Sequence, residues 1–273
     1  MTARLERAVI YVVLAAFSAV VLLPLVNILT IALQEPGSTV TGLSFPTGLH
    51  LENFVRAWEV GGFADLMSSS AIVAVVVVPV ATLLSILSGY AFGTMRFRGS
   101  TALFYLFLIG LVMPFEATVV PLYYDLRSLG LTDTYWALIL PEIALSVSFG
   151  TFWMRAFFLS SPRSLLEAAR IDGASSWATL WRVLLPTARP AISTLATLFF
   201  LWSWNEFLLA LVLIQDPALR TAPAGLGLFV GERTVDVAGL SAGALLITLP
   251  VIAVYLFTQR HFIRGMLEGS VKG

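Results

Sequence analysis

The chain alternates between long apolar runs and short polar connections. Six runs reach about 20 mostly apolar residues, which is the length that a helix needs to cross the hydrocarbon core of a bilayer. They cover residues 8–33, 67–93, 102–122, 135–154, 191–214 and 238–259. Lipid offers the backbone no hydrogen-bond partners, so these runs are predicted to be helices rather than strands. The pattern therefore predicts an all-α integral membrane protein with six transmembrane helices.

The first run is too long for a cleavable signal peptide, whose apolar core has about 7–15 residues, so we expect it to be a retained span. Several spans contain a proline, which removes one backbone N–H and is expected to kink the helix. These prolines are Pro24, Pro79, Pro114, Pro141 and Pro250.

One polar connection, between the fourth and fifth runs, has its own helical pattern. Its sequence is SPRSLLEAARIDGASSWATLWRVLLP. Ser161-Pro162 and Ser164-x-x-Glu167 are helix-start signals, and Gly173 is a helix-stop signal. Ser175 or Ser176 can cap a second helix, on which the apolar residues recur at i, i+3, i+4 and i+7, the spacing of one helical face. That face carries Trp177, Leu180, Trp181 and Leu184. The pattern predicts a helical hairpin, with Pro186 and Pro190 marking the return to the membrane.

Composition supports the membrane assignment and excludes several functions. Apolar residues make up 58% of the chain and charged residues 12%, against about 25% charged in an average soluble domain. The net charge of zero gives no indication of nucleic acid as a partner. The absence of cysteine excludes disulfides and thiolate metal sites. His50 and His261 are the only histidines, so we expect no metal site.

The distribution of Lys and Arg predicts the orientation, because these residues concentrate on the cytoplasmic side. Four of the sixteen lie in connections on one side: Arg56, Arg127, Arg220 and Arg233. The other twelve lie on the opposite side: Arg4, Arg7, Arg96, Arg98, Arg155, Arg163, Arg170, Arg182, Arg189, Arg260, Arg264 and Lys272. We therefore expect a multi-pass protein of the plasma membrane, bacterial or archaeal, with both termini and the hairpin in the cytoplasm.

The spacing of the hairpin alone leaves its contact open. An amphipathic helix with Trp, Leu and flanking Arg is equally suited to lying on lipid and to docking on a protein. A DNA-binding helix-turn-helix also has two helices and a glycine-bearing turn. That alternative is disfavoured because the hairpin is tethered to membrane at both ends and the chain is not basic overall.

The residues of the hairpin resemble the EAA motif of binding-protein-dependent ABC importer permeases. The resemblance rests on Glu167-Ala168-Ala169, Gly173 and Val183-Leu184-Leu185-Pro186 at the family spacing. It extends to SGYAFGTMRFRG (88–99), MPFEATVVPLY (113–123), WNEFLLAL (204–211) and the terminal GSVKG, which resemble the carbohydrate branch and its maltose-type second permease. One departure is MSSSAI before the second span, where the family usually has an Asn-Ser pair; this leaves the role of residues 68–70 open.

The resemblance implies the type I ABC importer permease fold and three regions. Residues 1–66 are the first transmembrane helix and an outer loop. Residues 67–260 are the transmembrane domain of five helices with the coupling loop 161–190, and residues 261–273 are a cytoplasmic tail. The implied partners are a second homologous permease subunit, two ATP-binding cassette ATPase subunits, an extracytoplasmic solute-binding protein and the lipid bilayer, with no nucleic acid.

The resemblance also implies which residues would couple this chain to the ATPase. They are Glu167, Ala168, Ala169, Asp172, Gly173, Trp177, Trp181, Leu185 and Pro186. No Gly-rich phosphate loop of the GxxxxGK[ST] type occurs in the chain. We therefore expect no cofactor and no catalytic residue here, with ATP and Mg²⁺ bound by the partner subunits, so that this chain is a transport subunit and not an enzyme.

Three spans carry one carboxylate each, and such residues usually face a cavity or a partner. Glu206, beside Trp204 and Asn205, is a candidate for the substrate path, since aromatic faces and acid or amide groups suit a sugar. The alternative is that Asn205 and Glu206 join helices through hydrogen bonds. Glu116 is also a path candidate, although for Glu116 and Glu142 helix packing is the favoured interpretation.

The last outer loop, residues 215–237, matches in position the loop that reaches the sugar-binding protein in the maltose system. Gly225, Gly227 and Gly231 would keep it adaptable, and an ordinary solvated loop is the alternative. The resemblance thus implies that the chain forms half of the transmembrane path for a sugar, from mono- to oligosaccharide. An importer of glycerol-phosphate or another polyol, or a secondary transporter driven by an ion gradient, remains as an alternative.

Overall fold

The computed structural model of the chain describes residues 2–42, 44–231 and 235–270. The described residues are largely helical, with one isolated antiparallel bridge between Val230 and Val235. In chain order the elements are α1 (Thr2–Ala32), α2 (Glu52–Val60), α3 (Phe63–Thr94), α4 (Ser100–Val112), α5 (Phe115–Ser128), α6 (Trp136–Ser160), α7 (Arg163–Ile171), α8 (Ser176–Ala178), the π-helical η1 (Thr179–Leu184), α9 (Leu185–Trp204), α10 (Leu208–Leu213), the 3-10 helix η2 (Pro217–Leu219), α11 (Ala222–Gly225), the 3-10 helix η3 (Leu226–Phe229) and α12 (Val237–Ser270).

These elements form two compact units. The smaller unit comprises Met1–Asp65 and Gly225–Leu249, and the larger unit comprises Leu66–Ala224 and Pro250–Gly273. Five helices are long and apolar enough to cross a membrane, and a bent pair of helices makes a sixth candidate. The number of predicted spans therefore agrees with the structure, while the course of two predicted spans, the third and the fifth, does not.

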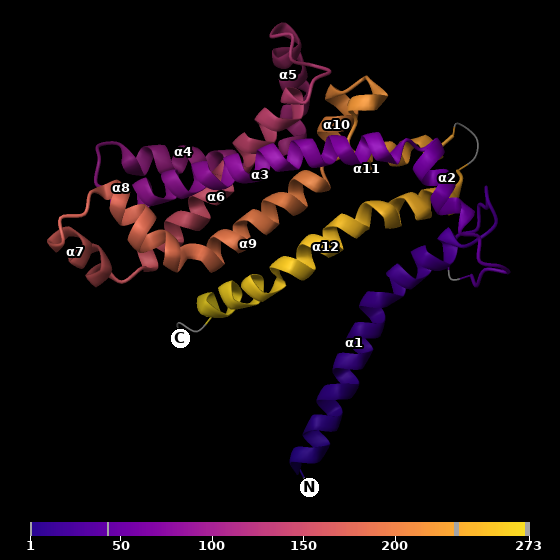
Figure 1. Cartoon of the computed structure of the whole chain (residues 1–273), viewed down its shortest axis with the longest axis horizontal. Helices are drawn as coiled ribbons and strands as arrows, with labels where there is room; N and C mark the ends of the chain where they lie inside the picture. The colour runs from indigo at the N-terminus through magenta and orange to yellow at the C-terminus, as the bar shows by residue number, and fades with distance from the viewer. Residues whose placement is uncertain (1, 43, 232–234, 271–273) are drawn as a thin grey trace. The chain divides into compact units, whose positions relative to one another are not determined.

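The predicted third span, residues 102–122, is not one helix. It is divided into α4 and α5, which meet at an angle of 99° (Figure 1). The break lies at Met113, whose ψ of 131° is extended. Proline disfavours the helical conformation in the residue before it and cannot donate to the helical ladder, so Pro114 ends α4. The kink expected at this proline is confirmed and is larger than a kink within one helix.

The predicted fifth span, residues 191–214, is also wrong at both ends. A continuous helical segment runs from Ser176 to Trp204, so the second helix of the hairpin continues directly into the membrane span. The π-helical turn η1 lies just before Pro186, which cannot donate a hydrogen bond to the Arg182 carbonyl. The prolines therefore modify the helix without interrupting it. At the other end, residues 205–207 separate α9 from the short α10.

The core of the larger unit forms around α6, which packs against α4 and α9. Small residues allow α3 and α6 to approach closely. A Cβ atom on Gly150 would lie 2.0 Å from the Ser85 hydroxyl, and one on Gly89 would lie 2.5 Å from the Cβ of Met154. The hydroxyls of Ser88 and Thr151 are 2.6 Å apart at the same contact. Small and hydroxyl-bearing residues are typical of helix contacts in membranes.

The smaller unit is organised by side chains that fix its loops. The Asn53 amide donates to the carbonyl oxygens of Ala32 and Gln34 at 3.0 and 2.7 Å. Arg56 of α2 pairs with Asp236, and Asp236 also accepts the Gly239 N–H at 2.9 Å at the start of α12. These contacts connect α2 to the segment that leads into α12.

Candidate functional site

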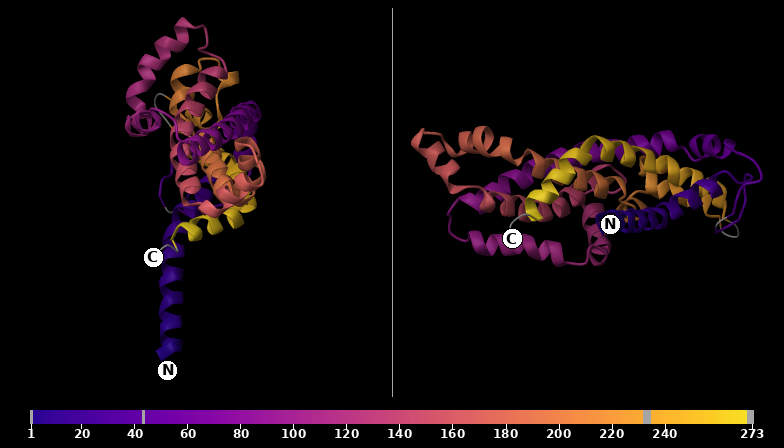
Figure 2. Two further views of the ribbon diagram at one scale, coloured as in Figure 1. Left: turned by 90° about the vertical axis from the view of Figure 1, so that its left-hand side faces the viewer. Right: turned by 90° about the horizontal axis from the view of Figure 1, so that it is seen from below.

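The predicted hairpin is present at one end of the larger unit. Helix α7 is followed by Gly173 and then by the helical segment α8–η1–α9 (Figures 1 and 2). Gly173 has a φ of +72°, a left-handed conformation that side chains other than glycine rarely adopt. The Ala174 N–H donates to the Ala169 carbonyl at 2.9 Å and the Gly173 N–H to the Arg170 carbonyl at 3.0 Å. This helix-ending geometry confirms the predicted glycine stop.

Of the helix caps predicted for the hairpin, the one for the second helix is present and those for the first helix are not. Ser175 caps the second helix, since its hydroxyl accepts the Ala178 N–H at 3.2 Å, as predicted. The caps predicted for the first helix are wrong. Pro162 is the N-cap of α7 and makes no side-chain cap, and the Ser161 hydroxyl instead donates to the Phe157 carbonyl at 3.2 Å. Ser161, which the sequence predicted as the cap of α7, thus belongs to the end of α6.

The apolar face of the second helix is divided between the interior and the surface. Leu180 and Leu184 are fully buried against the ends of α3 and α6, and Trp181 and Leu185 are partly buried on the same cluster. Trp177 keeps 62% of its surface exposed, and its ring lies 5.3 Å from the ring of Trp181. Leu180 and Leu184 therefore attach the hairpin to its own chain, whereas the exposed ring of Trp177 is available for a contact outside it.

Helix α7 presents a second exposed surface. Ala169 is buried and Leu166 packs on the core, whereas Glu167 and Ala168 are exposed. Asp172, Gly173 and Pro186 are exposed too. Sequence reasoning missed Ile171, which is 86% exposed at the end of α7; its signal is an apolar residue directly before the Asp-Gly turn. We call Glu167, Ala168, Ile171, Asp172 and Trp177 the hairpin tip.

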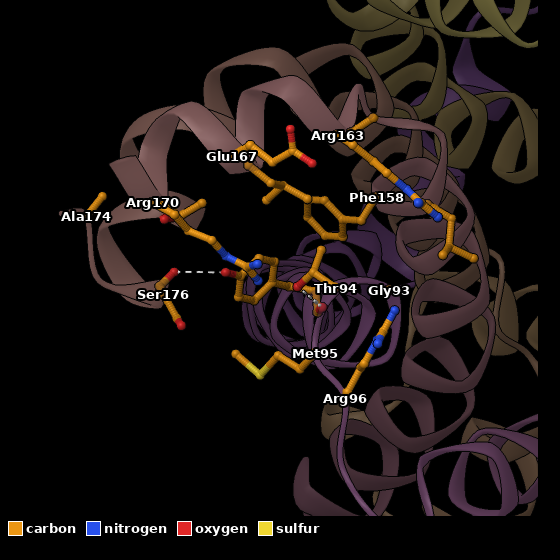
Figure 3. Close-up of a pocket in the computed structure, with 15 residues that line it drawn as sticks. Gly93, Thr94, Met95, Arg96, Phe158, Arg163, Glu167, Arg170, Ala174 and Ser176 are labelled. Atoms are coloured by element: carbon orange, nitrogen blue, oxygen red, sulfur yellow. Dashed lines mark hydrogen bonds between the residues drawn. The ribbon is translucent and has the colours of Figure 1, made fainter. Parts of the chain in front are cut away.

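A pocket of about 800 Å³ separates α7 from the ends of α3 and α6 (Figure 3). Three arginines line it, Arg96, Arg163 and Arg170, together with a single carboxylate, Glu167. Among the residues that the structure describes, Glu167 has no ion pair. The Tyr90 hydroxyl donates to the Ser176 carbonyl at 3.1 Å and fixes the hairpin to α3. The pocket leaves the carboxylate of Glu167 available to a basic group of a partner.

Three of the four substrate-path candidates, Trp204, Asn205 and Glu206, lie where α9 ends. The carboxylate of Glu206 accepts the N–H groups of Leu209 and Ala210 at 2.9 and 3.2 Å. It thereby caps α10, a role within its own chain that the sequence did not indicate. Trp204 is buried and stacks on Phe200 with a centroid distance of 5.4 Å. Asn205 is exposed, and its amide donates to the Leu201 carbonyl at 2.7 Å.

The other two intramembrane carboxylates differ in burial. Glu142 is buried in α6, and neither carboxylate oxygen has a hydrogen-bond partner among the described residues; the same holds for the nearby Ser203 hydroxyl. Glu142 thus lies inside the helix bundle without a hydrogen bond that joins it to another helix in the described part of the chain, and its packing role stays a prediction. Glu116 is exposed in the first turn of α5, next to the 99° bend. Both interpretations of Glu116, helix packing and the substrate path, stay predictions.

The first part of the last outer loop is fixed by polar side chains of the larger unit. The Ser70 hydroxyl accepts the Ala222 N–H at 2.9 Å, and the Ser69 hydroxyl donates to the Ala218 carbonyl at 3.2 Å. The carboxylate of Asp133 accepts the N–H groups of Gln215 and Asp216 at 2.9 and 2.8 Å. Two of the three serines whose role the sequence left open, Ser69 and Ser70, therefore anchor this loop.

The second part of the loop contains the three glycines selected from the sequence. Gly225 ends α11, Gly227 lies in η3 with open space around it, and Gly231 is exposed beside the Val230–Val235 bridge. Short helical turns thus replace the adaptable loop that was expected. Residues 232–234 of the predicted loop lie outside the described residues.

Comparison with known proteins places this geometry in a family. Residues 60–268 match the model of the binding-protein-dependent transport system inner membrane component. The chain is 38% identical over 230 residues to a probable ABC transporter permease of Bacillus subtilis, covering 84% of this chain and 76% of that protein. It is 34% identical over 229 residues to an arabinooligosaccharide transport system permease of Halalkalibacterium halodurans, covering 84% and 81%.

The fold is also found in a solved structure. A chain in the crystal structure of a bacterial ABC transporter that imports the acidic polysaccharide alginate superposes with a TM-score of 0.77, at 23% identity and over 96% of this chain and 98% of that chain. This likeness confirms the predicted ABC importer permease fold. The family match makes the protein a transport component rather than an enzyme, and it removes the secondary transporter as an alternative. The chain belongs to the family of inner membrane components of binding-protein-dependent transport systems.

Proposed function

We propose that this chain forms half of the transmembrane path for a sugar, from mono- to oligosaccharide. The solute is delivered by an extracytoplasmic binding protein. A second homologous permease subunit completes the path, and two ATPase subunits bind ATP and Mg²⁺. The carbohydrate relative supports the solute class, since it is named for arabinooligosaccharide transport. Within this chain, the sugar path runs past the break between α9 and α10, at Trp204, Asn205 and Glu206.

The hairpin tip carries this proposal. Glu167 is exposed and without an ion pair among the described residues, and Ile171 and Trp177 expose apolar surface beside it. An exposed tryptophan is the type of residue that protein interfaces use as an anchor, and the carboxylate beside it can form a charge-assisted pair with a basic group of the partner. The tip therefore docks on the ATPase, and Leu180, Leu184 and Leu185 transmit the contact to α3 and α6. Gly227 and Gly231, which are exposed, belong to the surface that meets the binding protein, and the buried Gly225 lies behind it.

Reconstituted transport tests the solute class. The chain, purified with its partner subunits and incorporated into proteoliposomes, should take up a labelled di- or oligosaccharide only when ATP and the binding protein are both present. A series from arabinose and trehalose to arabinan oligosaccharides identifies the solute size. Vesicles with a catalytically inactive ATPase subunit are the control. Uptake without ATP would contradict the coupling, and uptake of glycerol-phosphate or a polyol in place of every sugar would contradict the solute class.

The orientation is part of the proposal, with both termini and the hairpin in the cytoplasm. The chain has no cysteine, so single cysteines can report each side of the membrane. Arg98→Cys lies in the exposed connection before α4, and Ser128→Cys lies at the exposed end of α5. In spheroplasts, a membrane-impermeant maleimide should label Ser128→Cys at once and Arg98→Cys only after permeabilisation. The reverse order of labelling would contradict the proposed orientation.

A further inference from the structure

A second, smaller pocket lies in the larger unit, where α3 ends, α4 begins and α6 approaches its last turn. Its volume is about 140 Å³, and it shares no lining residue with the pocket beneath the hairpin. The lining residues are Phe92, Ser100, Thr101, Phe104, Tyr105 and Arg155. Arg155 is the only charged residue among them, so the pocket is cationic and aromatic.

The guanidinium of Arg155 is held in place, yet it has no anion. Its Nε donates to the Phe92 carbonyl at 3.3 Å, and its Cζ lies 4.1 Å from the centre of the Phe104 ring. The ring face attracts the cation and fixes its plane. Among the described residues, the two terminal nitrogens have no hydrogen-bond acceptor and no carboxylate pairs with them. These nitrogens carry four of the five N–H donors of arginine.

The other polar groups of the pocket are also suited to an acceptor-only ligand. The hydroxyls of Ser100 and Thr101 add two donors. Helix α4 begins here after Gly99 without a side-chain cap, and the N–H of its first residue, Ser100, donates to the Phe97 carbonyl at 3.3 Å. At about 30 Å³ per water molecule, the volume corresponds to roughly four to five waters, which accommodates one phosphate group but not a nucleotide. A planar guanidinium binds phosphate oxygens through paired hydrogen bonds.

The position of the pocket identifies the source of this phosphate. Arg155 precedes the last residue of α6, Ser160, by about 7.5 Å along the helix axis, given the rise of about 1.5 Å per residue. Phe92 lies near the end of α3, and Ser100 is the first residue of α4. All three are therefore at the same end of their spans, where phospholipid headgroups lie. Beside the pocket, α4 exposes Leu103, Tyr105 and Leu106, which offer acyl chains an apolar surface.

We propose that Arg155, Ser100 and Thr101 bind the phosphate of an anionic phospholipid. On the proposed orientation this lipid belongs to the cytoplasmic leaflet, and Arg96 and Arg98 in the connection from α3 to α4 add attraction for its negative charge. The bound headgroup supplies the counter-ion that Arg155 lacks and holds the first turn of α4 against α3 and α6. The site does not depend on which solute is transported.

Lipid titration followed by native mass spectrometry tests the site on the chain purified with its partner subunits. Phosphatidylglycerol should bind the wild-type protein about tenfold more tightly than phosphatidylcholine. Both lipids carry the phosphate, but the quaternary ammonium of phosphatidylcholine adds a positive charge that Arg155, Arg96 and Arg98 repel. Arg155→Gln should remove this preference. Arg189→Gln, which removes an exposed arginine of α9 outside the pocket, should retain it. Wild-type affinity of Arg155→Gln for phosphatidylglycerol would overturn the proposal.

Two further measurements distinguish lipid binding at this pocket from a loss of folding and from binding of a soluble anion. Thr101→Val keeps the size of the side chain and removes one hydrogen-bond donor. It should weaken phosphatidylglycerol binding about threefold. Unchanged binding in a folded Thr101→Val protein would overturn the proposal, even if Arg155→Gln failed to fold. Inorganic phosphate at millimolar concentration should not displace the lipid. Displacement of phosphatidylglycerol by phosphate at micromolar concentration would assign the pocket to a soluble anion.

Discussion

Glu167→Lys should lower ATP-driven uptake by at least about thirtyfold while leaving membrane insertion unchanged. The carboxylate of Glu167 is exposed and unpaired within the described chain, and the proposed ATPase contact supplies its basic partner. Losing one partner of a buried charge pair at an interface costs about 2–5 kcal/mol, and lysine adds repulsion. The measurement is uptake in proteoliposomes, with the amount of co-purified ATPase as a second readout.

The matched control is Glu6→Lys on α1, which makes the same charge change at another exposed position on the proposed cytoplasmic side. It should leave uptake and ATPase recovery unchanged. The test also separates docking from the lipid alternative. A hairpin that merely lay on an anionic membrane would tolerate or favour the new lysine, so normal uptake by Glu167→Lys would contradict the docking role.

Gly173→Val should reduce uptake more than about tenfold through backbone conformation alone. A Cβ atom at this position would meet nothing within 4 Å, so the substitution causes no steric clash with neighbouring atoms. The φ of +72° is the obstacle, because a β-branched residue is a strong outlier in the left-handed region and such strain costs about 1–3 kcal/mol. Relief of that strain moves α7 relative to Trp177 and separates the two halves of the hairpin tip.

Gly173→Asn is the matched control for this prediction. Asparagine adopts the left-handed conformation far more readily than valine, so it should retain most of the uptake although it adds a larger polar side chain. Equal loss in both variants would show that the ATPase contact excludes any side chain at this position, and would contradict the conformational explanation. Circular dichroism and the recovery of protein in the membrane confirm that both variants fold.

Apolar runs predicted how many times the chain can cross a membrane but not how each helix runs. A hydropathy window over residues 102–122 is insensitive to Pro114, because the residues on both sides of the proline are equally apolar. The extended conformation that proline imposes on Met113 nevertheless produces two helices. Similarly, Pro186 and Pro190 were expected to separate the hairpin from the next span, whereas η1 joins α8 to α9 in one helical segment.

The sequence predicted which residues make up the candidate site, but not which of them are buried in the chain and which are exposed. Even spacing assigns Trp177 and Leu180 to one helical face, and the structure exposes the first and buries the second. Their separation depends on where α3 and α6 end, which is a tertiary property. In the same way, Glu206 looked like a ligand for solute or a bridge between helices. Its hydrogen bonds to Leu209 and Ala210 show that it caps a helix whose start the sequence did not reveal.

The continuity of Ser176–Trp204 has a mechanical consequence. The segment contains 29 residues, and at a rise of about 1.5 Å per residue it is a rod about 44 Å long. One end carries Trp177 at the hairpin tip, and the other end leads into the break at Asn205 and Glu206. A force applied at the tip therefore needs no flexible joint to reach the break between α9 and α10. Tilting this rod about a point within it moves both ends, so a movement at the hairpin tip is accompanied by a movement at the proposed solute path.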